Sequence, residues 1–198
     1  MKSVMSPVIP NYVARHTARF PREIRLRDGS KLWLHQLHSG DREKLKAFFA
    51  RCSPEAIRYR FMSSIKAVSD SLLDYLADPD GSRHVALIAA QGEGDDERIV
   101  AEGRYVIFKE QPDAADIALL VVDEMQRRGI ATLLIRELAK LACSNGVTHF
   151  SADVLADNRA MLSLLRKTGH PLSTTVSHGV IHYELPIAVR ENRLSEAA

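Results

Sequence analysis

The sequence is poor in cysteine, carries little net charge and has no long apolar run. Only Cys52 and Cys143 are present, 91 positions apart and without CxxC or CxxH spacing. This excludes a disulfide scaffold and a cysteine-built zinc site, and it is typical of a reducing cytoplasm. The longest apolar run is far below the ~18 residues of a membrane helix, and Met1 to Phe20 lacks the apolar core of a secretory signal. We therefore expect a cytoplasmic protein with no membrane partner.

The net charge of +2 is too small to indicate a nucleic-acid partner by itself, but the charge is unevenly spread. The first 40 residues carry seven Lys or Arg against Glu23 and Asp28. No aromatic stacking pattern accompanies these basic residues, so a solvated segment explains them more simply than a nucleic-acid contact does. We expect a flexible basic arm over residues 1–21, one domain over 22–188 and a tail over 189–198.

The order of predicted elements favours a single α+β domain, for which 198 residues of 45% hydrophobic composition are sufficient. Alternation around Asp28-Gly29 and around His178-Gly179 predicts two β-hairpins. Helix starts are indicated at Asp41, Ser53, Ser69 and Asp157, and an amphipathic helix within 125–145. Strands are expected over 84–90, 99–108 (interrupted by Gly103), 115–122 and 147–155. Together these elements predict a mixed, largely antiparallel sheet with one parallel crossover, flanked by helices.

The most informative segment runs from Leu119 to Thr132, where an apolar strand leads through a short loop into the amphipathic helix. The first backbone N–H groups of a helix lack partners within it, and the helix dipole adds positive charge there, so this position favours a phosphate. Gly129 leaves room for a phosphate oxygen, and Arg127 and Arg128 add positive charge. The segment matches neither the GxxxxGK[ST] loop nor the dinucleotide fingerprint.

Two motifs resemble those of one known superfamily. Gln126 to Ala131 resembles the Q/R-x-x-G-x-G/A pyrophosphate loop of the GNAT (N-acetyltransferase) superfamily, and Val154 to Met161 resembles its later strand–turn–helix segment. Arg27 to Ser30 and Cys52 to Ala56 are similar to bacterial lysine acetyltransferases of the Pat type. The likeness spans roughly residues 20–187, as in a stand-alone acetyltransferase domain.

This resemblance implies a GNAT-type sheet and acetyl-CoA as co-substrate, with no metal. It also implies direct transfer of acetyl to a primary amine, first a protein lysine and second a small amine. The pantetheine arm would pair with the strand backbone and the pyrophosphate would lie at the helix start. The expected cofactor-binding residues are Leu120, Val121, Val122, Gln126, Arg127, Arg128, Gly129, Ile130, Ala131, Thr132 and Asn158. An ordinary helix-start role for Asn158 is the alternative.

Asp116 is the candidate base that accepts the proton of the amine. It lies ten residues before Gln126, where Pat-type enzymes carry a glutamate, and strand alternation places it on one face with Leu120 and Val122. A strand-end aspartate pointing into solvent is the alternative, and Glu102 on the neighbouring strand is the reserve base. Leu165 occupies the position where many family members have the tyrosine that protonates coenzyme A, so water, or Tyr105 or Tyr183, would take that role.

A different class of function is a non-catalytic acyl-CoA-binding regulatory module that keeps the loop but lacks a competent base. Nucleic-acid binding through the basic arm is a third hypothesis. Acceptor specificity is expected from residues 51–80 and from the last hairpin, and an oligomer is left open. His178 and His182 have no recognisable third ligand, which disfavours a zinc site there.

Overall fold

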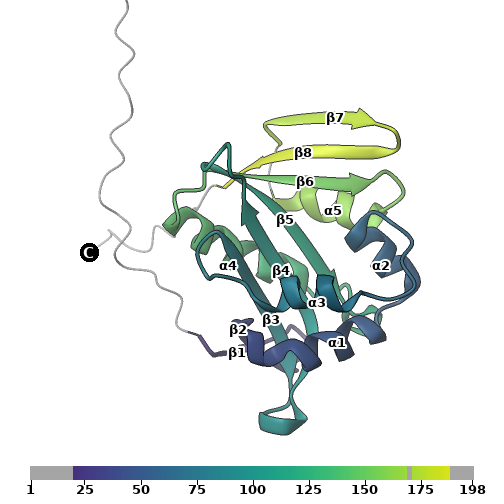
Figure 1. The fold of residues 1–198 in the computed structure, drawn as a ribbon, viewed down its shortest axis with the longest axis vertical. Helices are drawn as coiled ribbons and strands as arrows, with labels where there is room; N and C mark the ends of the chain where they lie inside the picture. The colour runs from purple at the N-terminus through teal and green to yellow at the C-terminus, as the bar shows by residue number, and fades with distance from the viewer. Residues whose placement is uncertain (1–19, 169–170, 188–198) are drawn as a thin grey trace, which may run out of the picture.

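The computed structural model describes residues 20–168 and 171–187 (Figure 1). The strands are β1 (Arg22–Arg25), β2 (Lys31–Gln36), β3 (His84–Gln91), β4 (Arg98–Ile107), β5 (Ala114–Val121), β6 (His149–Leu155), β7 (Ser173–Ser177) and β8 (Val180–Pro186). The α-helices are α1 (Arg42–Arg51), α2 (Pro54–Phe61), α3 (Asp70–Ala77), α4 (Ile130–Ser144) and α5 (Arg159–Thr168). Short 3₁₀ turns are η1 (Ser39–Asp41), η2 (Gly94–Asp96) and η3 (Asp123–Met125). Most of the predicted arm and the predicted tail lie outside the described residues.

The strands form one sheet in the order β1-β2-β3-β4-β5-β6-β8-β7. Every neighbouring pair is antiparallel except β5 and β6, which are parallel and joined through α4. The predicted sequence of elements, and the mixed sheet with one parallel crossover, are therefore confirmed. Among the described residues, no helix is both long and apolar enough to cross a membrane.

The two parallel strands pair over only a short length. The ladder between β5 and β6 joins Ala114 to His149, Ala115 to Phe150 and Asp116 to Ser151, and then it ends. β4 stays paired with β5 as far as Val121, and β8 stays paired with β6 as far as Leu155. Beyond Asp116 the two strands therefore diverge, as Figure 1 shows, and the sheet opens between them.

Helix α4 packs closely against β4 and β5 at Gly103. A Cβ at position 103 would lie 2.5 Å from Leu119 Cδ2 and 3.1 Å from Leu138 Cδ1. β4 runs through Gly103 without a break, so the predicted interruption of this strand is wrong. The glycine lets the helix approach the sheet, a packing reason that the sequence alone does not show.

Two of the four predicted helix starts have the predicted side-chain cap, whereas Asp41 precedes α1 without a side-chain cap bond, because its carboxylate accepts from His38 N instead. Ser53 Oγ accepts from Ala56 N at 3.2 Å, and Ser69 Oγ accepts from Leu72 N at 3.3 Å. At α5 the cap is Asn158, whose Oδ1 accepts from Met161 N at 3.0 Å, and not Asp157 as predicted. Either residue has a side chain that can cap a helix, and the sequence does not show at which of the two the helix begins.

Gly103→Ala should lower the free energy of unfolding by about 1–3 kcal/mol, because the added methyl must displace Leu119 and Leu138. Urea denaturation measures the change. Gly40→Ala is the matched control, since a Cβ there meets no atom within 4 Å and should change stability by less than about 0.5 kcal/mol. Equal stabilities for the two variants would contradict the close approach of α4 to the sheet.

Candidate active site

The opening between β5 and β6 provides an unpaired strand edge. From Ile117 to Val121, β5 pairs with β4 on one side but not with β6 on the other. An extended ligand can hydrogen-bond to such an edge as an added strand would. Leu120 and Val121 lie on this part of β5, and the buried Val122 follows it, as expected for the residues beside a pantetheine arm.

The loop that follows β5 leads into the start of α4, where the first backbone N–H groups of the helix lie. Arg127 and Gly129 both have left-handed backbone, with φ of 61° and 87°. The first bond of the helix runs from Leu133 N to Gly129 O at 3.1 Å, so the N–H groups of Ile130, Ala131 and Thr132 have no partner within the helix. A Cβ at Gly129 would meet no atom within 4 Å, so the space beside the loop is open. This geometry fits an anion.

The polar side chains of this loop point in different directions. Gln126 folds back, and its Nε2 donates to Val121 O at 3.2 Å. Arg128 pairs with Asp28 in the β1–β2 turn at 2.5 Å. Arg127 is exposed. Arg127 is therefore the better placed of the two arginines to contact an anion, whereas Arg128 ties the loop to the first hairpin.

Asp116 lies at the point where β5 and β6 separate, since its pair with Ser151 is the last of the ladder. Its side chain reaches solvent, but the surrounding protein displaces much of its hydration and raises the pKa to about 6. The charge of Arg60 opposes this shift and that of Asp153 adds to it. A carboxylate with such a pKa is ionised at neutral pH and is a stronger base than an ordinary aspartate.

Glu102, the reserve base, lies in a buried charge cluster. It is fully buried, and its Oε1 accepts from Arg104 Nε at 2.5 Å, while Arg60 Nε from α2 lies 3.7 Å from Oε2. Arg104 Nη1 also donates to His84 Nε2 at 2.8 Å. Burial and then the charge of Arg104 lower the pKa of His84. Glu102 thus connects α2 to the sheet, and Asp116 is the carboxylate that reaches the opening.

Helix α2 bridges the opening, because it contacts an aspartate that follows each of the two diverging strands. Ser53, at its start, donates from N and Oγ to the Asp123 carboxylate, each at 2.8 Å. At its other end, Arg58 pairs with Asp157 at 2.5 Å and Tyr59 donates from its hydroxyl to Asp157 O at 3.3 Å. Asp123 follows β5 and Asp157 follows β6. Sequence reasoning missed this bridge, whose one signal was an aspartate after each strand.

The remaining candidate residues lie mostly in the core. Asn158 is buried and caps α5 through its Oδ1, so the helix-start role is confirmed. The cap does not use the side-chain amide nitrogen, so this nitrogen can still donate to a carbonyl of a ligand. Tyr105 is buried on the sheet face opposite Asp116, where its hydroxyl accepts from Asn145 Nδ2 at 2.8 Å. Tyr183 and Leu165 are buried as well. These positions leave water as the simplest source of the proton for the departing thiolate.

An open strand edge, a helix start with unpartnered N–H groups and a carboxylate at the apex are the features expected of an acyl-CoA-dependent acyltransferase. Residues 44–170 match the model of the Acetyltransferase (GNAT) family, to which this chain belongs. An acetyltransferase of Pseudomonas aeruginosa is 33% identical over 139 residues, which cover 70% of this chain and 74% of that protein.

Two further relatives point to the Pat type. Acetyltransferase Pat of Mycolicibacterium smegmatis is 30% identical over 149 residues, 75% of this chain but 44% of that protein. The crystal structure of the GNAT domain of S. lividans PAT superposes with a TM-score of 0.75 at 26% identity, covering 83% of this chain and 96% of that one. The chain thus matches less than half of the mycobacterial protein and nearly all of the excised domain.

Arg58→Ala should raise the KM for the acceptor several-fold and leave binding of acetyl-CoA unchanged, because it releases α2 from Asp157. Asp157→Ala should have a similar effect, and the double variant should be no worse than either single variant, since all three remove one interaction. Steady-state kinetics with varied acceptor, and calorimetry with acetyl-CoA, measure both quantities. Additive effects of the two substitutions would contradict a bridging role for this pair.

Proposed function

We propose that this protein transfers acetyl from acetyl-CoA to the amino group of a protein lysine. The observation that carries the proposal is the opening between β5 and β6, with the anion-binding loop at one end and Asp116 at the other. The loop from Gln126 to Thr132 would hold the pyrophosphate, and the edge of β5 would pair with the pantetheine arm. The acetyl group would then lie toward Asp116.

The reaction requires a neutral amine. A lysine amine has a pKa of ~10.4 and is mostly protonated at neutral pH, so a proton must first pass to a base. Asp116 accepts it, directly or through water, and the amine attacks the thioester carbonyl carbon. A backbone N–H of β5 stabilises the negative oxygen that develops. The C–S bond then breaks, the nitrogen loses its second proton to give the neutral amide, and water carries that proton to the thiolate of coenzyme A.

Two features support a protein lysine over a small amine. The relatives that match over most of the chain include Pat-type acetyltransferases. Asp116 and Asp153 also lie close enough together for the charge of Asp153 to raise the pKa of Asp116, and these two carboxylates, the second of which contacts His182, favour a cationic side chain. A small amine is the alternative acceptor. The experiment that separates them is thiol release from acetyl-CoA with a panel of proteins, peptides and free amines.

The same assay tests the non-catalytic alternative. We expect calorimetry to show that acetyl-CoA binds, and the thiol assay to show release of coenzyme A with a protein acceptor. Binding without thiol release on any acceptor of the panel would favour an acyl-CoA-binding regulatory module. Failure to bind acetyl-CoA would contradict the assignment of the loop from Gln126 to Thr132.

The kcat/KM should fall as the pH drops through about 6, because Asp116 accepts a proton only in its ionised form. Asp116→Asn should lower kcat by about 10²- to 10⁴-fold and abolish this limb of the profile. Asp153→Asn is the control. It removes a negative neighbour, so the pKa of Asp116 should decrease and the limb should move to lower pH with kcat retained. A profile unchanged in Asp116→Asn would exclude Asp116 as the base.

Gly129→Ala should raise the Kd for acetyl-CoA at least about 10-fold, because the methyl enters the space beside the loop amides and strains the left-handed backbone. Gly146→Ala, just past the other end of α4, is the matched control. Its φ of 83° is nearly the same and a Cβ there also meets no atom within 4 Å, so the cost to folding should be equal. Acetyl-CoA calorimetry on both variants separates ligand binding from backbone strain, and equal Kd values would overturn the role of Gly129.

A further inference from the structure

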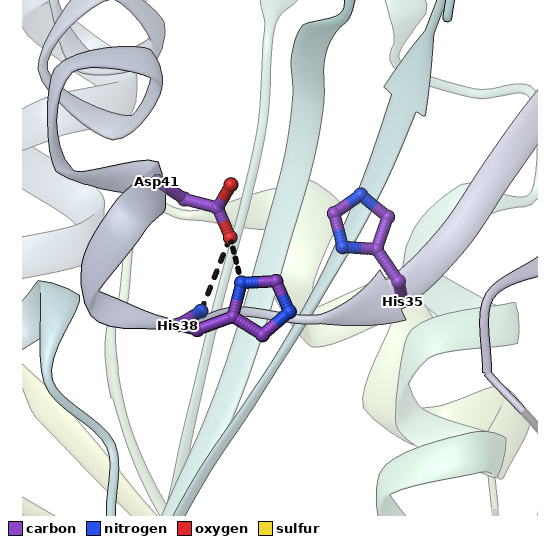
Figure 2. Close-up of side chains that lie close together, drawn as sticks. All are labelled: His35, His38 and Asp41. Carbon is purple, nitrogen blue, oxygen red and sulfur yellow. Dashed lines mark hydrogen bonds and ion pairs between the residues drawn. The ribbon is translucent and has the colours of Figure 1, made fainter. Parts of the chain in front are cut away.

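A second cluster of titratable side chains lies at the end of β2, in the segment His35-Gln36-Leu37-His38-Ser39-Gly40-Asp41. His35 is on β2, His38 precedes η1 and Asp41 ends it, directly before α1. One ligand atom from each of the three lies within 4.8 Å of those of the other two. Figure 2 shows Asp41 and His38 turned toward each other, with the ring of His35 beside them. We propose that this cluster, together with Glu97, binds a divalent transition-metal ion of the zinc class.

Both imidazole rings are held in the form that a metal ion requires. His35 Nδ1 lies 3.1 Å from the backbone oxygen of Gln36, which can only accept, so Nδ1 carries a proton and, in the neutral ring, Nε2 presents its lone pair. His38 Nδ1 lies 2.8 Å from Asp41 Oδ2, which directs its Nε2 in the same way. An oxygen partner on the far nitrogen orients the histidine ligands of most protein metal sites.

The environment of His35 Nε2 gives a second, independent indication. This atom is buried and has no hydrogen-bond partner among the described residues, yet Glu97 Oε2 lies 3.2 Å away. In the tautomer set by Gln36, a nitrogen lone pair thus faces a carboxylate oxygen, and two acceptors at this distance repel each other. A cation between them removes the repulsion, and 3.2 Å is close to the spacing of two ligands on one zinc ion.

The donor set and its charge also fit. Two imidazole nitrogens with carboxylate oxygens are borderline ligands that suit Zn²⁺ better than Ca²⁺ or Mg²⁺. Asp41 Oδ2 is occupied by the backbone N and the Nδ1 of His38, so Asp41 orients that ring and can offer its other oxygen. Lys44 holds Glu97 Oε1 at 3.0 Å and leaves Oε2 facing His35.

Small movements would complete the site. Ligand atoms of a tetrahedral zinc ion are roughly 3.4 Å apart, so atoms at the 4.8 Å limit must approach each other by about 1.4 Å. The side chain of His38 is 68% exposed and can move, and it provides the path by which an ion enters. A bound ion would tie the end of β2 to the start of α1 and to the segment before β4.

Zinc binding to the full-length, untagged chain tests the proposal, after treatment with a chelator. Calorimetric titration with ZnCl₂ should show one ion per chain and raise the Tm, and Co²⁺ should give the visible absorption of a tetrahedral site. His35→Ala and His38→Ala should each weaken zinc binding at least about 10-fold. His178→Ala, a histidine in the β7–β8 turn, is the matched control and should bind zinc as the unaltered chain does.

Should His35→Ala fail to fold, His38→Ala keeps the test valid, because its exposed side chain is replaceable and its backbone N still donates to Asp41. Absence of zinc binding by the unaltered chain would overturn the proposal and show that a proton on His35 alone offsets the Glu97 charge. Equal affinities of the unaltered chain and of the double variant His35→Ala/His38→Ala would overturn it as well, by locating the ion elsewhere.

Discussion

The short ladder between β5 and β6 is the constraint on which the rest of the site depends. A parallel pair must be joined by a crossover, and here α4 makes it. After Asp116, β5 continues along β4 while β6 continues along β8, so the two strands are drawn apart by their other partners. The divergence exposes the edge of β5, brings Asp116 to the apex, and leaves the start of α4 facing the same opening. The open strand edge, the proposed base and the proposed anion site thus depend on one feature of sheet pairing.

Helix α2 spans this opening, and the contacts that hold it involve charged groups. Its ends contact Asp123 and Asp157, and from beneath Arg60 reaches Glu102. The buried group of Arg60, Arg104 and Glu102 has one more positive than negative charge. Burying ions costs free energy, so this arrangement favours one position of the helix more than it stabilises the fold as a whole. The position of α2 over the opening is therefore specific.

The local features of the chain were well predicted from its sequence. Ser53 and Ser69 cap the helices that they were expected to open, and the turn at His178-Gly179 has the left-handed backbone of a tight hairpin. The predictions were wrong where two interpretations fitted the same local sequence equally well. Asp157 and Asn158 can each cap a helix, and a glycine in a strand, such as Gly103, indicates either a break or a close approach of another element. Only the packing of α4 and the contact of Asp157 with α2 distinguish these cases.

The sequence by itself determined the order of the elements, the GNAT-type sheet and the loop before α4, because these depend on neighbouring residues and on the period of apolar side chains. Tertiary structure decided which of two carboxylates reaches the opening. Asp116 and Glu102 both belong to predicted strands, but one lies where pairing ends and the other beneath α2, among two arginines. It also decided that His35 and Glu97, 62 positions apart, face each other. Such juxtapositions depend on strand pairing between distant segments, which no local pattern encodes.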